Sequence, residues 1–246
     1  MSSAQSGSFA LSAPPLAALL DTASAPYRSV SSFAYRFARG KLSRDPAFRG
    51  ILERGLLRSR ARILDLGCGQ GLLTAWLRAA RELHDAGEWP KGWPLPPWPQ
   101  SIRGIELMDS DVERARLALG ASCGVSQGDI REARFGDVDA VVILDVLHYM
   151  DDQAQRDILE RVRAALTVGG LLLLRIGDAA GGLRFHYTQW VDHAVMLLRG
   201  HSWVKTHCRP VSAWKTLLEA QAFKVEAVPM SQGTPFANVL LICHAV

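Results

Sequence analysis

The chain has few cysteines, and none of them lies in a spacing that suits a metal site or a compact disulfide framework. Its 246 residues contain four, which stand far apart: Cys68, Cys123, Cys208 and Cys243. A CxxC pair, the usual signature of a structural zinc site, is missing from the sequence. We therefore expect reduced thiols, no bound metal and a cytoplasmic protein.

Long hydrophobic runs are missing as well. A membrane-spanning helix needs about 20 consecutive apolar residues, and the apolar run Leu16–Leu20 is far shorter. The residues before it are small and polar, and they lack the basic start of a secretory signal. The sequence thus predicts a chain without a membrane span, in which residues 1–27 form a flexible N-terminus.

Acidic residues are scarce between Arg28 and Arg62. This stretch holds ten Lys or Arg and only two acids, although the net charge of the whole chain is only +4. Apolar residues recur at helical spacing from Val30 to Leu56, so we expect residues 28–61 to form a helical N-terminal cap. Its basic side chains either meet an acidic partner or an anionic substrate, or form an ordinary solvated helix face.

The stretch I-L-D-L-G-C-G-Q-G is the most informative in the sequence. It predicts a short buried strand, then a tight turn with Gly67, Gly69 and Gly71, then a helix over residues 72–83. Glycine permits positive φ and close approach of a ligand, and a helix start offers free N–H groups. The stretch therefore predicts a site for a nucleotide-like ligand. Its G-x-G-x-G spacing differs from the dinucleotide G-x-G-x-x-G, and Asp65 would repel a pyrophosphate but suit a cation.

The chain beyond this loop alternates between predicted strands and helices, which is typical of a mostly parallel α/β sheet. Strands are expected at residues 101–107, 124–127, 139–145 and 171–176. Residues 223–228 and 237–244 are joined too closely for a crossover and predict an antiparallel hairpin. Residues 84–100 hold five prolines and three tryptophans and predict an irregular insertion. It either covers the parent domain, which we favour, or contacts a partner.

Acidic residues follow the ends of two predicted strands. Glu106 ends the second strand, where a carboxylate can accept hydrogen bonds from both hydroxyls of a ribose. It lies 35 residues after Gly71, whereas about 20 is usual, and the insertion accounts for the difference. Asp145 follows a continuous apolar run, which is typical of a strand buried on both faces. Both acids are thus expected at the carboxyl edge, where α/β sheets bind ligands.

The D-L-G-C-G-Q-G loop, Glu106, Asp129-Ile130 and Asp145 together resemble the motifs of class I S-adenosylmethionine (SAM)-dependent methyltransferases. The resemblance covers residues 62–246 and implies a Rossmann-like, seven-stranded, mostly parallel sheet with a C-terminal antiparallel hairpin and helices on both faces. It implies SAM as the cofactor, with Glu106 on the ribose, Asp129 and Ile130 around the adenine and Asp145 near the methionine part. The implied cofactor-binding residues are Asp65, Gly67, Cys68, Gly69, Gly71, Glu106, Leu107, Asp129, Ile130, Asp145 and Val146.

Three further runs are similar to a narrower group within that family. They are Phe37-Ala-Arg-Gly-Lys-Leu, Leu144-Asp-Val-Leu-His-Tyr and Gly233-Thr-Pro-Phe-Ala-Asn, and they look like bacterial methyltransferases of pigment (aryl polyene, xanthomonadin-like) and fatty-acid-type biosynthesis. This likeness implies a small aromatic or carrier-bound acyl substrate, methylated on a hydroxyl or carboxyl oxygen.

A hydroxyl acceptor would benefit from a general base, and His148 is placed for that role just after the fourth strand. Alternatively, His148 contacts the cofactor or is simply hydrogen-bonded at the strand end. The candidate substrate contacts are Tyr35, Arg39, Tyr149, His186 and Tyr187. The sequence after the fourth strand is not the N/D-P-P-Y type of nucleic-acid methyltransferases, which argues against a nucleic-acid substrate.

Three other functions stay open at this point. An NAD(P)-linked oxidoreductase would need the other glycine spacing and an evident Tyr-Lys or similar pair for hydride transfer. A binding module without catalysis would be favoured by a damaged loop or a missing ribose acid, and neither is seen. RNA or protein methylation rests only on the basic stretch before the first strand. The sequence does not predict the oligomeric state.

Overall fold

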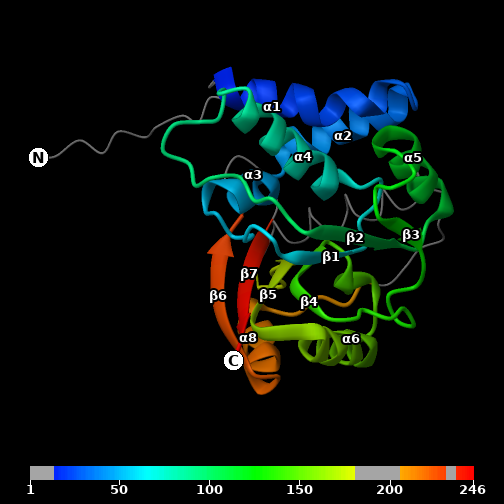
Figure 1. The fold of residues 1–246 in the computed structure, drawn as a ribbon. Coiled ribbons are helices and arrows are strands. Elements are labelled where there is room, and N and C mark those ends of the chain that lie inside the picture. Colours follow the sequence, from blue (N-terminus) through cyan, green and yellow to red (C-terminus); the bar gives the residue numbers. More distant parts are fainter. Residues whose placement is uncertain (1–13, 181–205, 231–236) are drawn as a thin grey trace, which may run out of the picture.

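The computed structural model describes residues 14–180, 206–230 and 237–246, which form one seven-stranded sheet between two layers of helices (Figure 1). The strand order across the sheet is β3-β2-β1-β4-β5-β7-β6. The strands are β1 Arg62–Leu66, β2 Ser101–Glu106, β3 Val125–Gln127, β4 Val138–Leu144, β5 Leu166–Gly177, β6 Phe223–Pro229 and β7 Asn238–Ala245. The predicted α/β fold is confirmed.

Pairing is parallel from β3 to β5, and β7 runs antiparallel to both of its neighbours, β5 and β6. β1 and β4 lie in the middle of the sheet and are apolar on both faces, as expected for parallel strands covered by helices. Because β1, β2 and β4 are parallel, the residues that follow them gather at one carboxyl edge. The predicted C-terminal hairpin completes the sheet beside β5, and Asn238, at the start of β7, pairs with Gly177 at the end of β5.

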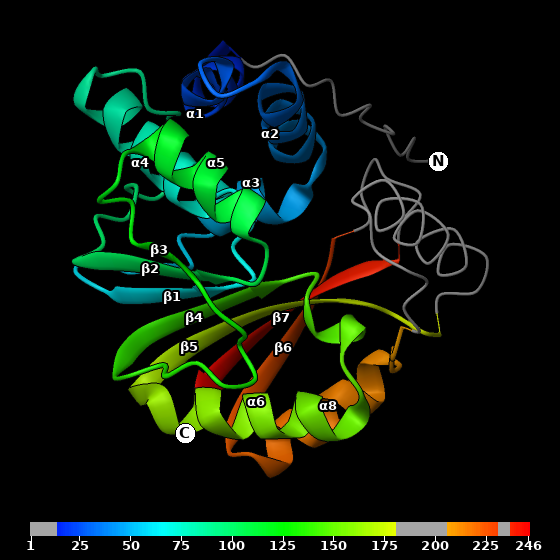
Figure 2. The ribbon, with the colours of Figure 1, turned by 90° about the vertical axis from the view of Figure 1, so that its right-hand side faces the viewer.

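The two helical layers bury opposite faces of the sheet (Figure 2). One layer contains α1 Pro14–Ser24, α2 Ser32–Arg44, α3 Pro46–Glu53, α4 Leu72–Asp85 and α5 Asp109–Leu119. The other contains α6 Asp152–Ala165 and α8 Val211–Ala220, and the short 3-10 turns are η1 Ala25–Arg28 and η2 Leu147–Tyr149. Side chains of β5 alternate between the two cores, since Leu171 and Leu173 face the first layer and Leu172 and Leu174 face the second.

The structure differs from the expected flexible N-terminus over residues 14–27. These residues form α1 and η1, and Leu19 and Tyr27 are fully buried. The Tyr27 hydroxyl donates a hydrogen bond to the backbone carbonyl of Gln70, inside the glycine loop. The apolar run Leu16–Leu20 is short for an independent helix, but α1 packs against α4, and this packing stabilises it.

The insertion rich in Pro and Trp is irregular, as predicted, although α4 first continues to Asp85. Trp89 and Trp93 are partly buried against the first core and touch each other edge to face. The Trp98 ring is 54% exposed and lies under the guanidinium of Arg81, at 3.6 Å. The insertion thus covers its own domain. The predicted helix near residues 190–198 and the turn at 231–235 lie outside the described residues.

Among the described residues, we find no helix with the length and apolar character needed to cross a membrane.

Candidate active site

The glycine loop leaves β1 with three residues in the left-handed region. Gly67, Gly69 and Gly71 have φ values of 72°, 55° and 80°. Residues other than glycine rarely adopt such positive φ values. A Cβ on Gly67 would lie 2.3 Å from the Cγ2 of Val146, whereas a Cβ on Gly69 would meet nothing within 4 Å. The loop is therefore packed against β4 on one side and open beside Gly69.

Glu106 organises this loop from the end of β2. Its Oε2 accepts a hydrogen bond from the backbone N–H of Gly69 at 2.8 Å, and its Oε1 accepts one from the N–H of Met108 at 3.0 Å. A carboxylate has about four acceptor positions, so these bonds leave capacity for the hydroxyls of a ligand. Glu106 is well placed for the predicted ribose contact.

Asp65 lies beneath the loop and is only 5% exposed. Burial, together with the nearby Glu106 carboxylate, raises the pKa of Asp65 to about 7. A bound cation would favour the charged form, which fits the expected sulfonium or ammonium ligand.

Four charged side chains, one of which is Asp145 itself, meet just after the end of β4. Arg175 of β5 pairs with both Asp145 and Asp45, and Lys41 of α2 lies 2.8 Å from Asp145 and 2.9 Å from Asp45. The Arg175 and Asp45 side chains are 1% and 5% exposed. Burial alone would raise the pKa of Asp45, but the charges of Arg175 and Lys41 outweigh it and hold this pKa well below its ordinary value.

This cluster fixes the strand end and joins it to the N-terminal helices. Asp145 has a φ of 60°, a left-handed conformation that is strained for a residue other than glycine. Bonds from Arg175 and Lys41 hold its carboxylate. Sequence reasoning identified Asp145 but missed Arg175 and Asp45, the residues with which it clusters. An arginine inside the apolar run of β5 was the available signal, because such a charge is buried only when paired.

Cys68 lies in the glycine loop, between Gly67 and Gly69. Its side chain is buried, and a Cβ on Gly104 would lie 2.5 Å from its sulfur. Burial, followed by the charges of Asp65 and Glu106, raises the pKa of this thiol far above its ordinary value. Cys68 therefore offers a ligand its backbone and no reactive thiolate.

The predicted adenine contacts lie at the same sheet edge. The Asp129 carboxylate is bound by the side chain and the backbone N–H of Arg131, and these bonds lower its pKa. Ile130 is 5% exposed and packs in the second core, so it offers little surface to a ring. Leu107 and Phe33, by contrast, are 57% and 55% exposed. The Phe33 ring lies beside Arg114 of α5.

His148 lies in η2, immediately after the Asp145 turn. Its ring centroid is 4.0 Å from that of Tyr149, and its backbone carbonyl accepts a hydrogen bond from His207. Burial, with a smaller effect of the Lys41 charge, lowers the pKa of His148 to about 4. The imidazole is therefore neutral near pH 7 and a weak base. Gln155 holds this turn by donating to the carbonyls of Leu147, Met150 and His207.

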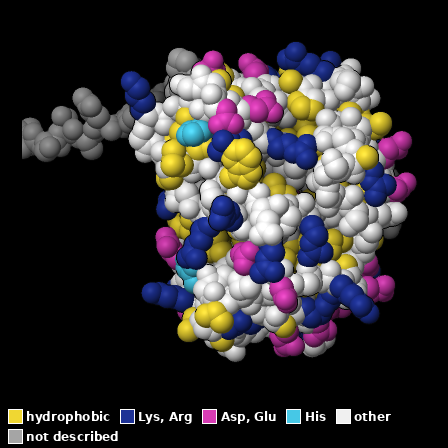
Figure 3. All heavy atoms as spheres, in the orientation of Figure 1, with side chains coloured by type: hydrophobic (Ala, Val, Ile, Leu, Met, Phe, Trp, Pro, Cys, Tyr) yellow, Lys and Arg dark blue, Asp and Glu magenta, His cyan; other side chains and the backbone are white. Residues whose placement is uncertain are grey.

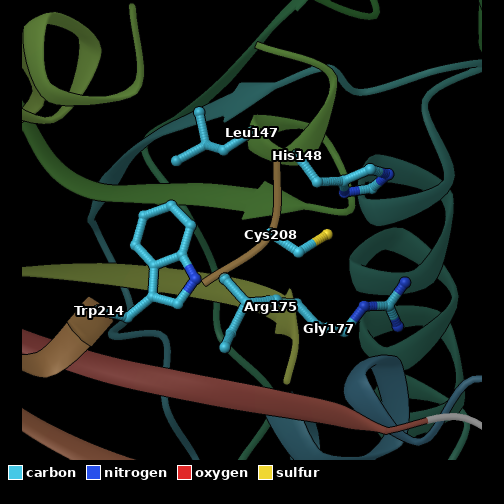
Figure 4. A pocket seen from close by; sticks show the side chains of 7 residues that line it. Leu147, His148, Arg175, Gly177, Cys208 and Trp214 are labelled. Atoms are coloured by element: carbon cyan, nitrogen blue, oxygen red, sulfur yellow. The ribbon is translucent and has the colours of Figure 1, made fainter. Parts of the chain in front are cut away.

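A small pocket of about 10 Å³ lies beside this turn, with room for about one water molecule. In Figure 4 the imidazole of His148, the thiol of Cys208 and the guanidinium of Arg175 extend in the same direction. Leu147 and Trp214 lie on the opposite side. This arrangement places polar groups from three separate segments next to one another.

Two predicted substrate contacts lie elsewhere. Arg39 forms an ion pair with Asp21 of α1, and the hydroxyl of Tyr35 accepts a hydrogen bond from Arg28. Their helical positions put them on the α1 side of α2, while Lys41 faces Asp145. The cap approaches Asp145 through Lys41. His186 and Tyr187 lie outside the described residues.

A family model described as a methyltransferase domain matches residues 36–228, which is most of the chain. The chain belongs to the methyltransferase domain family. This membership confirms the family that the motifs predicted, and the carboxyl-edge residues above lie within the matched part of the chain.

Curated relatives match only part of the methyltransferase. Carboxy-S-adenosyl-L-methionine synthase of Chromohalobacter salexigens is 32% identical over 130 residues, which cover 51% of this chain and 43% of that protein. Trans-aconitate 2-methyltransferase of Mycobacterium tuberculosis is 30% identical over 132 residues, with 53% and 42% covered. The chain thus spans less than half of the length of these relatives.

Solved structures share the fold of the methyltransferase. Magnesium protoporphyrin IX methyltransferase from Synechocystis, solved with bound SAH, has a TM-score of 0.57 at 14% identity and covers 90% of this chain and 94% of its own. An O-methyltransferase family protein from Burkholderia thailandensis has a TM-score of 0.59 at 19% identity, with 89% and 61% covered. At these identities the likeness shows the fold.

Proposed function

We propose that this chain is a SAM-dependent methyltransferase that transfers a methyl group to an oxygen atom of a small acceptor. The observation that carries the proposal is the set of three carboxyls at one sheet edge. Asp65, Glu106 and Asp145 surround a glycine loop that is open at Gly69. Such a site suits a ligand that carries both a positive charge and ribose hydroxyls.

In this proposal each residue binds or orients the cofactor. Glu106 accepts hydrogen bonds from the ribose, and Asp65 favours the positive end. Gly69 admits the ligand, while Val146 and Asp145 border its methionine part. Leu107 and Phe33 supply apolar surface for the adenine, with Asp129 near its amine. SAM, when bound, brings a methyl group activated by its sulfonium, so the chain mainly aligns the reactants and excludes water.

The low pKa of His148 bears on the acceptor. An imidazole with a pKa of about 4 is poorly matched to removing a proton from a hydroxyl near pH 7. A carboxylate acceptor needs no base. We therefore favour a carboxyl oxygen, and one matched relative is named for an organic acid, trans-aconitate. His148 then acts as a neutral polar neighbour, and Tyr149 as a wall. An aromatic or carrier-bound acyl acid remains the predicted acceptor.

The proposal is tested by titration calorimetry of the purified chain with SAM, S-adenosylhomocysteine and NAD. Micromolar binding of the first two with no heat from NAD is the expected result. Binding of NAD alone would contradict the proposal and favour the oxidoreductase. With tritiated SAM and candidate acids, a labelled product that mild base cleaves identifies a methyl ester, whereas a base-stable product identifies an ether.

The affinity for SAM is expected to fall in acid because Asp65 must lose its proton to meet a cation. In the free chain its pKa is raised to about 7, so binding near pH 6 should be about tenfold weaker than near pH 8. Asp65→Asn should bind weakly at both pH values with little slope. A wild-type affinity that is flat over this range would contradict the role of Asp65.

The same raised pKa predicts how the stability of the free chain varies with pH. The folded chain holds the Asp65 proton up to about pH 7, whereas the unfolded chain loses it near pH 4. The contribution of Asp65 to the free energy of unfolding is thus fully present in acid and is lost as pH rises toward 7.

Alanine at two loop glycines should give opposite results. Gly67→Ala meets Val146 and has a positive φ, so it should lower the free energy of unfolding by about 2–4 kcal/mol. Gly69→Ala points into open space and should lower it by only about 1–2 kcal/mol. Its Cβ, however, occupies room left for the ligand, so SAM affinity should fall. Urea unfolding and calorimetry separate the effects, and unchanged SAM binding by Gly69→Ala would contradict the proposed pose.

A further inference from the structure

A larger cavity of about 330 Å³ lies at the opposite edge of the sheet from the glycine loop. Its walls come from the loop before β1, the start of β4, the first residues of β5 and the end of β7. Small-molecule sites have volumes of about 300–1,000 Å³, so this cavity is in that range. The strands hold it roughly 20 Å from the carboxyl edge.

One wall is an irregularity in β5. Val138 pairs with Leu166 and Ala140 pairs with Leu171, so the four residues 167–170 stand opposite Asp139 alone. Gly169 has a φ of 70°, and a Cβ on Gly170 would lie 2.8 Å from the carbonyl oxygen of Thr167. Such bulges re-aim backbone and side chains next to sites. The cavity therefore depends on a specific local sequence.

The opposite wall is the loop that carries Arg58 and Arg60, and the Trp/Pro-rich insertion holds it. The Arg60 N–H donates to the carbonyl of Trp98 at 2.6 Å, and the Trp98 N–H donates to Ser59 Oγ at 3.1 Å. The Gln100 N–H donates to the carbonyl of Ala61 at 2.9 Å. The insertion thus fixes this wall, a role that the proposed methyl transfer does not require.

The cavity is basic because its one carboxylate is already neutralised. Asp139 accepts hydrogen bonds from the Arg62 side chain and backbone and from Thr167. The bonds from Arg62 hold the pKa of Asp139 well below its usual range. Arg58 and Arg60 are exposed and form no ion pair with an acid in the described part of the chain, and His244 lies in the same wall.

We propose that this cavity binds a small phosphate-bearing molecule between Arg58 and Arg60. Guanidinium groups bind phosphate oxygens in pairs through two parallel N–H donors. The face in Figure 3 looks onto this end of β4 and β5, and Lys and Arg side chains are spread across its middle. The bulge and the loop of Arg58 and Arg60 line the cavity on two sides, which suits a small molecule better than a nucleic acid.

The test uses the full chain and inorganic pyrophosphate as the probe, in calorimetry at constant ionic strength. One saturable site is expected, and Arg58→Gln/Arg60→Gln should weaken it by at least about tenfold. The matched control Arg36→Gln/Lys215→Gln removes two positive charges on α2 and α8, and it should bind within about twofold of the wild type. Saturating S-adenosylhomocysteine should leave the binding unchanged, since that ligand belongs at the other edge.

Several results would overturn the proposal. They are heat no larger than with matched sodium chloride, equal loss in the control variant, or displacement by S-adenosylhomocysteine. Citrate that binds as tightly as pyrophosphate would overturn the assignment to phosphate. Thermal unfolding of each variant shows that it is folded, and a failure here leaves the proposed methyl transfer untouched.

Discussion

Glu106→Ala is expected to weaken SAM binding by more than about a hundredfold. The variant loses the acceptor for both ribose hydroxyls, and charge-assisted hydrogen bonds contribute about 1.5–3 kcal/mol each. It also frees the Gly69 N–H, which Glu106 holds at 2.8 Å, so the loop loses its fixed shape. Calorimetry with SAM measures the loss directly.

Two further variants make this result specific. Glu106→Gln keeps the shape but turns one acceptor into a donor facing the N–H of Gly69 or Met108, so an intermediate loss is expected. Glu113→Ala removes an exposed carboxylate from α5 and should bind SAM like the wild type. Retained affinity in a folded Glu106→Ala variant would disprove the ribose contact.

Arg175→Met is expected to lower the free energy of unfolding by about 3–5 kcal/mol, because it leaves the buried Asp45 carboxylate with only the partly exposed Lys41 as a partner. Arg175 pairs with Asp45 and Asp145, and the Arg175 and Asp45 side chains are 1% and 5% exposed. Asp145, whose backbone is left-handed, keeps Lys41 but loses the Arg175 bonds to its carboxylate. Urea unfolding followed by circular dichroism gives the change.

Arg62→Met is the matched control. It also removes an ion pair between a strand arginine and an aspartate, Asp139, but those side chains are 35% and 34% exposed. Pairs this accessible are screened by water and contribute about 0–1 kcal/mol. Equal losses in the two variants would show that burial of the Arg175 cluster does not set its energy.

Periodicity and glycines predicted most of the fold. The strands predicted at residues 101–107 and 139–145 and the helix predicted at residues 72–83 were placed within one or two residues. The sequence predicted that the strand β5 starts at Leu171, because Thr-Val-Gly-Gly looks like a turn. In the structure β5 starts at Leu166. Leu166 belongs to the strand because it pairs with Val138. A local sequence pattern does not predict a contact between residues this far apart in the chain.

The site could be predicted where a residue acts at a strand end, as Glu106 does. Side-chain direction on a helix was harder to predict. Tyr35 and Arg39 share α2 with Lys41, yet only Lys41 meets Asp145. Which face of α2 turns toward the sheet depends on the packing of its buried alanines, Ala34 and Ala38. The basic stretch alone cannot report that choice.

The bonds from the N-terminal helices to the glycine loop set an order of folding. Ala34 accepts a hydrogen bond from the Gln70 side chain, and Tyr27 donates one to the Gln70 carbonyl. Helices of 11 and 13 residues such as α1 and α2 are marginal in water by themselves. During synthesis they emerge before α4, the helix against which α1 packs. Synthesis of the roughly 40 residues from the end of α2 to the end of α4 takes about 2–8 s at about 5–20 residues per second, and the glycine loop and its cap then fold as one unit.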